Sequence, residues 1–347
     1  MDKKILTVGV IGFGLSGRYL MIPYLMVNKN FRVKTVVQHT SDTASKIFPG
    51  VISTKNPEDV LTDPEIDLVI ISSPNNTHFE YAKKSLLAGK HVLVEKPMTT
   101  TFEEALELIV LAQKVGKILS VYQNRRFDGC FKTVQKIIEN NLLGTIFNVE
   151  FHFDRWRPEQ NPKKWKEIPS LGVGILYDLG AHVIDQALYL FGVPTGFDGV
   201  VQQQRPGSLV DDAFDIRLYY PDKIVTLKSS MLVREPTPRF ILHGMHGSFV
   251  KYGADPQEDQ LKAGMTPDMP NFGEDTPAFY GSLNTDINGL NFQGKIKTLK
   301  GDFGELFQNI YEAIAEGKEL IVKPELVAEQ IRIMESIKTI GKNILTR

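Results

Sequence analysis

The sequence predicts an α/β chain in which a doubly wound parallel sheet is followed by an α+β region with an antiparallel sheet that has one solvated face. In the first third, short apolar runs alternate with segments of helical periodicity, which is typical of parallel strands joined by helices. Further along, segments of period two follow one another without helices between them, which favours antiparallel strands. A chain of 347 residues exceeds one ordinary core, so we expect two domains, residues 1–122 and 123–347.

Composition and charge narrow the classes of function. The net charge of −1 offers no basic field to hold nucleic acid or an anionic membrane. A single cysteine, Cys130, excludes an internal disulfide and a thiolate-rich metal site. No apolar segment is long enough to span a bilayer, so we expect a cytoplasmic protein.

The first element is an apolar run, Ile5–Ile11, which predicts a buried strand and is followed at once by a glycine-rich turn and a helical pattern. Gly12 allows a tight turn, Gly14 lets the backbone approach a pyrophosphate, and Gly17 lets helix and strand pack closely. The free amides and the dipole of the helix N-terminus favour an anion. We interpret this corner as the phosphate-binding turn of a Rossmann dinucleotide fold, with a chance match as the alternative. The candidate cofactor ligands of the turn are Gly12, Phe13, Gly14, Leu15, Ser16 and Gly17.

The next strand, residues 31–38, ends where the choice between NAD and NADP is made. An acid at this end would accept hydrogen bonds from the ribose hydroxyls of NAD and would repel a 2′-phosphate. The sequence instead offers neutral side chains, and the first acid, Asp42, comes later. We therefore favour NADP, with a reach of Asp42 to the ribose as the alternative. The cofactor candidates here are Gln38, His39, Thr40 and Ser41.

Two further strand ends place polar residues on the same edge of the sheet. The strand over 66–73 runs into Pro74-Asn75-Asn76-Thr77-His78, and the strand over 91–95 runs into Lys96-Pro97. Ligands of open parallel sheets bind beyond the carboxyl ends of the strands, so Lys96 is expected near the nicotinamide. A solvated lysine leaving a strand is the alternative interpretation. The cofactor candidates at these ends are Ser73, Pro74, Asn75, His78, Glu95 and Lys96.

The second domain contains one segment with the residues of acid–base chemistry. Asp178 and His182 are four residues apart in a helical pattern, so they share one face, and Gly180 between them leaves room for a flat ring. We interpret His182 as a general base beside a carboxylate that holds the substrate. One alternative is a helix cap at Asp178 with His182 in the core. The other is a metal site that includes Asp185, which its apolar neighbours disfavour.

The remainder of the second domain is predicted from simple patterns. Wide sheets seldom stay uncovered, so the far face of this sheet is a candidate subunit interface. Residues 254–300, rich in Gly, Pro, Asp and Asn, are predicted to form long loops, and the last helix, 324–344, is a candidate to pack back on the first domain. The expected strands are 147–153, 214–220, 225–233 and 240–243.

These motifs, in this order and spacing, resemble the Gfo/Idh/MocA oxidoreductase family over essentially the whole chain. Three further segments resemble its NADP-dependent scyllo-inositol 2-dehydrogenase branch: residues 124–128 (NRRFD), 153–155 (FDR) and 252–258 (YGADPQE). The resemblance implies a Rossmann domain followed by an open antiparallel sheet, and a homodimer or homotetramer formed through that sheet. It also implies a cis peptide bond before Pro97.

The resemblance further implies hydride transfer between NADP(H) and a ring carbinol or ketone of a cyclic polyol or sugar, with scyllo-inositol/inosose favoured. The catalytic residues would be Lys96, Asp178 and His182, and Asn124 would also contact the cofactor. An aldose or sugar-acid dehydrogenase is one alternative, and a non-catalytic NADP-sensing regulator is another. An arginine pair such as Arg125 and Arg126 is also commonly a hinge ion pair. The substrate-binding candidates are Lys96, Asn124, Arg125, Asp154, Trp165, Asp178 and His182, with Arg126 and Arg155 beside them.

Overall fold

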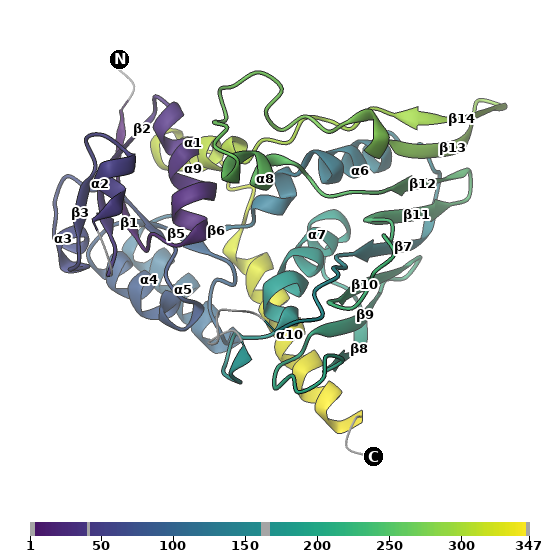
Figure 1. The fold of residues 1–347 in the computed structure, drawn as a ribbon, viewed down its shortest axis with the longest axis horizontal. Coiled ribbons are helices and arrows are strands. Elements are labelled where there is room, and N and C mark those ends of the chain that lie inside the picture. The colour runs from purple at the N-terminus through teal and green to yellow at the C-terminus, as the bar shows by residue number, and fades with distance from the viewer. Residues whose placement is uncertain (1–3, 40–41, 161–166, 345–347) are drawn as a thin grey trace. The chain divides into compact units, whose positions relative to one another are not determined.

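The computed structural model describes residues 4–39, 42–160 and 167–344, with side chains described up to residue 339 (Figure 1). The chain forms two compact units. The first comprises Met1–Asn124, Gln257–Phe272 and Asp302–Ala328, and the second comprises Arg125–Pro256, Gly273–Gly301 and Glu329–Arg347. The expected division into independent domains at residues 122 and 123 stays a prediction. Within the described residues, no helix has the length and apolar character needed to cross a membrane.

The first unit is built on a six-stranded sheet in the order β3-β2-β1-β4-β5-β6, and all its strand pairs are parallel. Its central strand β1 is buried along its whole length, because helices cover both faces of such a sheet. The strand order reverses between β1 and β4, and in open α/β sheets ligands bind at this switch point. The strands are β1 (Leu6–Ile11), β2 (Phe31–Val37), β3 (Ile52–Thr54), β4 (Leu68–Ile71), β5 (His91–Glu95) and β6 (Leu119–Tyr122).

The helices of this unit begin and end at recognisable sequence signals. A capping box starts α5, because Thr101 and Glu104 each accept a hydrogen bond from the other's main-chain N–H, and Gly116 ends it in the left-handed conformation. Its helices include η1 (Ser16–Met21), α1 (Ile22–Val27), α2 (Thr43–Ile47), α3 (Glu58–Leu61), η2 (Asn75–Thr77), α4 (His78–Leu87), α5 (Phe102–Val115), α8 (Gln257–Lys262) and α9 (Gly304–Glu316).

An aromatic cluster explains why late segments of the chain belong to the first unit. The ring of Tyr24, on α1, lies 6.1 Å from that of Phe272 and 5.8 Å from that of Phe303. The Tyr24 hydroxyl also donates a 2.6 Å hydrogen bond to Gln257. Buried aromatic pairs of this kind stabilise beyond their area, so three segments distant in sequence share one core.

The second unit is built on an eight-stranded sheet in the order β14-β13-β12-β11-β7-β10-β9-β8. Only β7 and β10 pair in parallel, so the sheet is mixed and largely antiparallel. Helices α6 and α7 lie on one face (Figure 1). These findings confirm the predicted fold class, with the one parallel pair as a refinement. The strands are β7 (Ile146–His152), β8 (Gly196–Gln202), β9 (Ala213–Tyr219), β10 (Ile224–Ser230), β11 (Phe240–Gly244), β12 (Gly247–Lys251), β13 (Gly281–Ile287) and β14 (Leu290–Ile296).

The inner face of this sheet carries the core. Phe151, Phe240 and Phe249 alternate with half-buried side chains and are themselves fully buried. Phe131 of α6 packs on Phe240 at a centroid distance of 6.2 Å. The helical segments not yet named are η3 (Asn124–Phe127), α6 (Gly129–Glu139), η5 (Leu176–Gly180), α7 (Ala181–Phe191), η6 (Pro277–Phe279) and α10 (Pro324–Ile344).

The prediction of long loops over 254–300 is wrong for the helix α8 and for the hairpin β13–β14. Strand β13 alternates buried and exposed residues, but its polar composition hides that period, since only Leu283 and Thr285 among its side chains are buried. The turn is Asn288-Gly289, both with positive φ (50° and 83°). This dipeptide is the strongest short hairpin signal, and it was available in the sequence.

A buried ion pair joins the start of the second unit to α7. Arg126 donates from Nε and Nη2 to the two carboxylate oxygens of Asp185 at 2.8 and 2.7 Å, and both side chains are almost fully buried. Burial raises the pKa of Asp185, and the neighbouring guanidinium opposes that rise. The pair fixes the position of Arg126 relative to α7. A shift of either side chain would leave a buried charge without its partner.

We expect Asp185→Ala to lower the free energy of unfolding by about 3–5 kcal/mol, because Arg126 would keep a buried charge without its partner. Urea denaturation measures this loss. Asp222→Ala is the control, since the exposed Asp222 carboxylate pairs with Lys223, and exposed ion pairs add little to stability. Equal losses in the two variants would contradict the role given to the Arg126–Asp185 pair.

Candidate functional site

The glycine turn after β1 is packed directly against the end of β4. Gly12 has φ +107°, and a Cβ there would lie 2.5 Å from the main-chain oxygen of Ser72. A Cβ at Gly17 would lie 2.6 Å from the oxygen of Gly12 and 2.7 Å from Ser72 Oγ. Both distances are far inside van der Waals contact, so only glycine allows the turn, the first helix and β4 to meet here.

Gly14, in contrast, faces open space. A Cβ built at this position would meet no heavy atom within 4 Å. The next residue, Leu15, is exposed, whereas Phe13 packs edge-on against Phe48. The first helical amides follow immediately at Ser16, whose hydroxyl donates a 2.7 Å hydrogen bond to Glu95. A glycine beside a helix N-terminus with free space above it fits a bound pyrophosphate.

The end of β2 carries no carboxylate that is free of a partner. Gln38 is buried and donates to Ser53 Oγ at 3.2 Å, while its Oε1 accepts from Thr43. Asp42 forms an exposed ion pair with Lys46 at 2.9 Å, and a hydrogen bond from Lys46 lowers the pKa of Asp42. His39 is exposed, and the candidates Thr40 and Ser41 lie outside the described residues. The described residues of this strand end thus present neutral side chains and an acid that is already paired.

His78 ties together the turns that follow β4 and β5. Its two ring nitrogens lie 2.9 Å from the main-chain oxygen of Ser73 and 2.8 Å from that of Pro97. The ring is fully buried, and burial lowers its pKa. The Lys96–Pro97 peptide bond is cis, which confirms the expectation from the family resemblance. His78 therefore fixes the main chain on either side of the candidate site residues at these two strand ends.

Lys96 and Asn75 are positioned by this framework. Lys96 is half-buried at the end of β5, directly before the cis bond. Asn75 begins η2, after Pro74 in the turn that follows β4. The first unit thus groups its candidate residues at the carboxyl ends of β1, β2, β4 and β5, the edge at which the sequence analysis expected them.

In the second unit, Asp178 and His182 lie on one continuous helical segment, η5 followed by α7. His182 is 6% exposed, and its ring centroid lies 6.3 Å from that of Phe153. The interpretation of Gly180 as room for a flat ring is wrong. A Cβ there would lie 2.9 Å from Leu176 and 3.4 Å from Phe214, so this glycine serves packing in the core.

Asp211 holds the beginning of that helical segment, and the sequence analysis did not identify it. Its carboxylate accepts from the N–H of Leu176 at 2.9 Å, and its main-chain oxygen accepts from Ile175. Lys338 of α10 completes the contact, 3.1 Å from Asp211 and 2.7 Å from the oxygen of Val173. A carboxylate is favourable at a helix N-terminus. The tandem acids Asp211-Asp212 were the available signal, although their partners lie far away in sequence.

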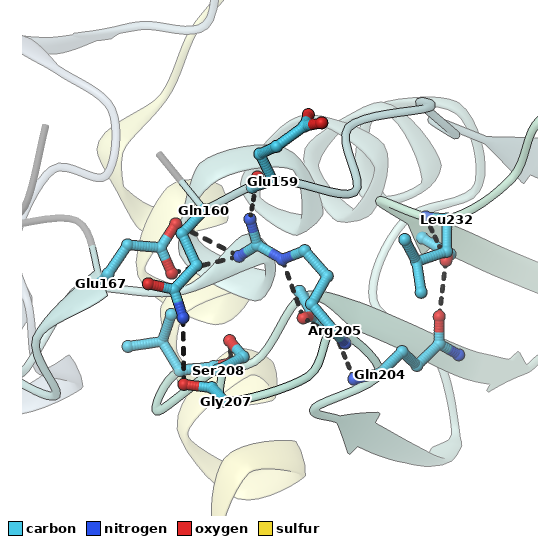
Figure 2. Close-up of polar contacts among 11 residues, drawn as sticks. Glu159, Gln160, Glu167, Gln204, Arg205, Gly207, Ser208 and Leu232 are labelled. Atoms are coloured by element: carbon cyan, nitrogen blue, oxygen red, sulfur yellow. Dashed lines mark hydrogen bonds and ion pairs between the residues drawn. The ribbon is translucent and has the colours of Figure 1, made fainter. Parts of the chain in front are cut away.

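The neighbouring acid, Asp212, anchors the buried Arg205. Arg205 Nε donates to Asp212 at 3.0 Å, Nη1 to the main-chain oxygen of Glu159 at 3.0 Å, and Nη2 to both carboxylate oxygens of Glu167 at 3.2 Å. Figure 2 shows this guanidinium between Glu159 and Glu167. Arg205 thus holds Glu159 and Glu167 against the segment that contains Asp211 and Asp212. The candidate Trp165 lies outside the described residues.

Asp154 and Arg125 are also engaged within the second unit. Asp154 accepts from Ser230 N–H at 2.9 Å and Thr237 Oγ1 at 2.7 Å, and it lies 3.3 Å from His152. Burial acts to raise the pKa of Asp154, but the hydrogen bonds from His152 and Thr237 outweigh burial and lower it. Arg125 forms an ion pair with Asp128 at 3.4 Å.

Comparison with known families identifies the class of protein. A model described as the NAD-binding Rossmann fold of an oxidoreductase family matches residues 6–123. A model described as the C-terminal alpha/beta domain of that family matches residues 135–339. The chain therefore belongs to the Gfo/Idh/MocA oxidoreductase family, which confirms the resemblance seen in its motifs.

Individual relatives and solved structures are similar to this chain over nearly its whole length. The scyllo-inositol 2-dehydrogenase (NADP(+)) IolW of Bacillus subtilis (strain 168) is 37% identical over 329 residues, which are 95% of this chain and 92% of IolW. The solved structure of YvaA from Bacillus subtilis has a TM-score of 0.95 at 36% identity and covers 99% of this chain and 98% of that one. An oxidoreductase structure from Bacillus cereus has a TM-score of 0.90 at 39% identity over 96% of each chain.

We expect Gly14→Ala to fold normally and to weaken binding of the dinucleotide cofactor, tested with both NADPH and NADH, by about tenfold or more, ~1.4 kcal/mol. The added methyl meets no protein atom and would occupy the space assigned to the pyrophosphate. Fluorescence titration measures the dissociation constant, and thermal unfolding checks the fold. Gly17→Ala is the comparison variant, because its methyl would collide with the main chain and lower the melting temperature. An unchanged dissociation constant in Gly14→Ala would show that the cofactor does not bind against Gly14.

Proposed function

We propose that this protein is an NADP-dependent dehydrogenase that acts on a ring carbinol of a cyclic polyol or sugar, with scyllo-inositol and its inosose as the first substrates to test. The observation that carries the proposal is the polar edge of the first unit. It combines open space at Gly14 with a β2 end whose acid, Asp42, is already paired. The activity and the cofactor for which IolW is named support the same choice.

The nicotinamide, when bound, supplies the hydride chemistry. His182 removes the hydroxyl proton from the carbinol, and Lys96 stabilises the developing alkoxide as an ammonium. Asp178 binds a neighbouring hydroxyl and orients the base. In the reverse direction the same groups return the proton to the ketone oxygen. A non-catalytic regulator has no use for this proton relay, so the presence of both Lys96 and His182 favours an enzyme.

We further propose a homodimer or homotetramer formed through the face of the eight-stranded sheet opposite α6 and α7, and a cytoplasmic location. The sheet alternates fully buried with half-buried or exposed side chains along β7 and β10, so its second face carries side chains available to a partner subunit. Burial of such a face between copies removes the exposed surface that a wide sheet otherwise presents.

The test of catalysis compares Lys96→Met and His182→Ala with the wild type. We expect kcat/KM for polyol oxidation to fall by about 10²–10⁴-fold in each, because a proton acceptor or an alkoxide partner is lost, while the NADPH dissociation constant stays unchanged. Absorbance at the NADPH band measures turnover. Lys114→Met and His243→Ala, which lie outside the proposed site, serve as controls. A wild type that binds NADPH but oxidises no polyol or sugar would support the regulator instead.

The cofactor preference is tested separately with Gln38→Asp. We expect this variant to shift the ratio of kcat/KM values toward NADH by about tenfold or more, because a carboxylate repels the 2′-phosphate and accepts from the ribose hydroxyls. Asp42→Asn is the control, since Asp42 already pairs with Lys46. Equal wild-type activity with both cofactors would refute the argument from Gln38.

A further inference from the structure

Helix α10 carries a polar side chain in the middle of its buried face. Gln330 is fully buried, and so are its apolar neighbours on that face, Ile333 and Met334. A buried amide is costly unless it is hydrogen-bonded, so a glutamine at such a position indicates a specific polar contact. Gln330 Nε2 donates a hydrogen bond to the main-chain oxygen of Ala181. The buried amide of α10 thus holds the main chain directly before the candidate base, His182.

A second contact from α10 lies about two helical turns further along the helix, at Lys338. Its ammonium lies 2.7 Å from the main-chain oxygen of Val173 and 3.1 Å from the carboxylate of Asp211. The later residue of α10 therefore meets the earlier part of the chain that leads into η5 and α7, so the two run antiparallel. Helix α10 contacts this chain before Asp178 and again directly before His182.

The contact at Asp211 is closely fitted. Gly174 has φ +110°, and a Cβ there would lie 2.2 Å from Asp211 Oδ1, so only glycine lets the carboxylate approach the main chain. The carboxylate lies between the N–H of Leu176, at 2.9 Å, and the ammonium of Lys338, at 3.1 Å. Hydrogen bonds to a charged group are strong and directional. The contact therefore fixes the start of η5 against α10.

Between the two contacts, the chain forms a π turn. In η5, the N–H of Ala181 bonds to the oxygen of Leu176, five residues earlier. Such turns are rare and occur mostly singly, frequently at functional sites. The additional residue of a π turn changes the angle at which the following side chains leave the helix. The turn therefore sets the direction of His182 relative to Asp178, and α10 holds the chain on both sides of it.

We propose that Gln330 and Lys338 are positioning residues of the dehydrogenase, because they set the place and direction of His182 and Asp178 through the main chain. This inference rests on the proposed function and extends it to a helix far along the sequence. Proton transfer requires the base to lie within hydrogen-bond reach of the hydroxyl. A displacement of about 1 Å can lower a rate by about 10²-fold, even when the altered residue is distant from the reaction.

The first experiment removes each contact and keeps an apolar side chain of similar length. In Gln330→Met and Lys338→Met we expect kcat to fall about 10–100-fold, with the NADPH dissociation constant unchanged. The substrate is scyllo-inositol, or glucose if the wild type oxidises it faster. Ile333→Val removes a methyl group from the same buried face, and Arg332→Met removes a cation whose partner, Glu329, lies on α10 itself at 2.7 Å. Both controls keep the wild-type kcat.

A double-mutant cycle separates positioning from a loss of folded protein. If Gln330 acts through His182, then Gln330→Met lowers the rate of the wild type but not the residual rate of His182→Ala. Partial unfolding would lower both rates by the same factor, because it reduces the amount of active protein. Equal losses in the two backgrounds overturn the proposal. If Gln330→Met does not fold, the less buried Lys338→Met is used in a cycle with Asp178→Asn.

NMR of labelled histidine rings gives a readout that needs no turnover. The signal of His182 is identified by its absence in His182→Ala. We expect this signal to move in Gln330→Met and Lys338→Met, and to keep its position in Ile333→Val and Arg332→Met. Unfolded protein gives a separate signal, so a change in stability alone does not move the signal of the folded state.

The outcomes separate the two hypotheses. Turnover by the wild type with unchanged kcat in Gln330→Met and Lys338→Met overturns the positioning role and leaves the proposed function standing. Absence of turnover for every polyol and sugar overturns the proposed function. In that case a moved His182 signal in Gln330→Met or Lys338→Met supports the positioning of the imidazole by α10, and an unchanged signal overturns it.

Discussion

The structure of the first unit depends on one close approach, that of the turn after β1 to the end of β4. Side-chain atoms at Gly12 or Gly17 would overlap the main chain of Ser72 or of the turn itself, so the contact exists only because both residues are glycine. The approach brings the first helix over the switch point of the sheet. The hydrogen bond from Ser16 to Glu95 then joins that helix to β5, the strand that carries Lys96. Steric constraint at two residues thus decides how the first helix lies against the carboxyl ends of β4 and β5.

In the second unit, ion pairs and hydrogen bonds position the candidate site residues. The helical segment of Asp178 and His182 is held at its beginning by Asp211 and Lys338, and further along by the buried pair of Arg126 with Asp185. Buried charges need partners in fixed geometry, so these contacts restrict the segment to one register, although they add little net stability. Arg205 extends the same device to Glu159 and Glu167 (Figure 2). In the first unit, close packing at glycine residues positions the site residues. In the second unit, buried ion pairs do so.

The sequence predicted those features that depend on local pattern. The glycine turn, the parallel strands and the spacing of Asp178 and His182 all follow from a few consecutive residues, and the sheet order of the first unit agrees with them. Features that depend on distant partners could not be predicted. Nothing near Asp211 indicates Lys338, and nothing near Arg239 indicates that Phe153 lies under it. Even within a predicted motif, the role of Gly180 could not be predicted. Its neighbour Phe214 belongs to β9, a strand further along the chain.

Charge in this protein acts locally rather than through a long-range field. The net charge of −1 gives an approaching anion no attraction at a distance, and salt screens exposed pairs such as Asp42 with Lys46. Buried groups are screened far less, so the pair of Arg126 with Asp185 keeps its strength in salt. A chain of nearly balanced charge can therefore hold its elements in place through a few buried ion pairs, while its exposed pairs contribute little.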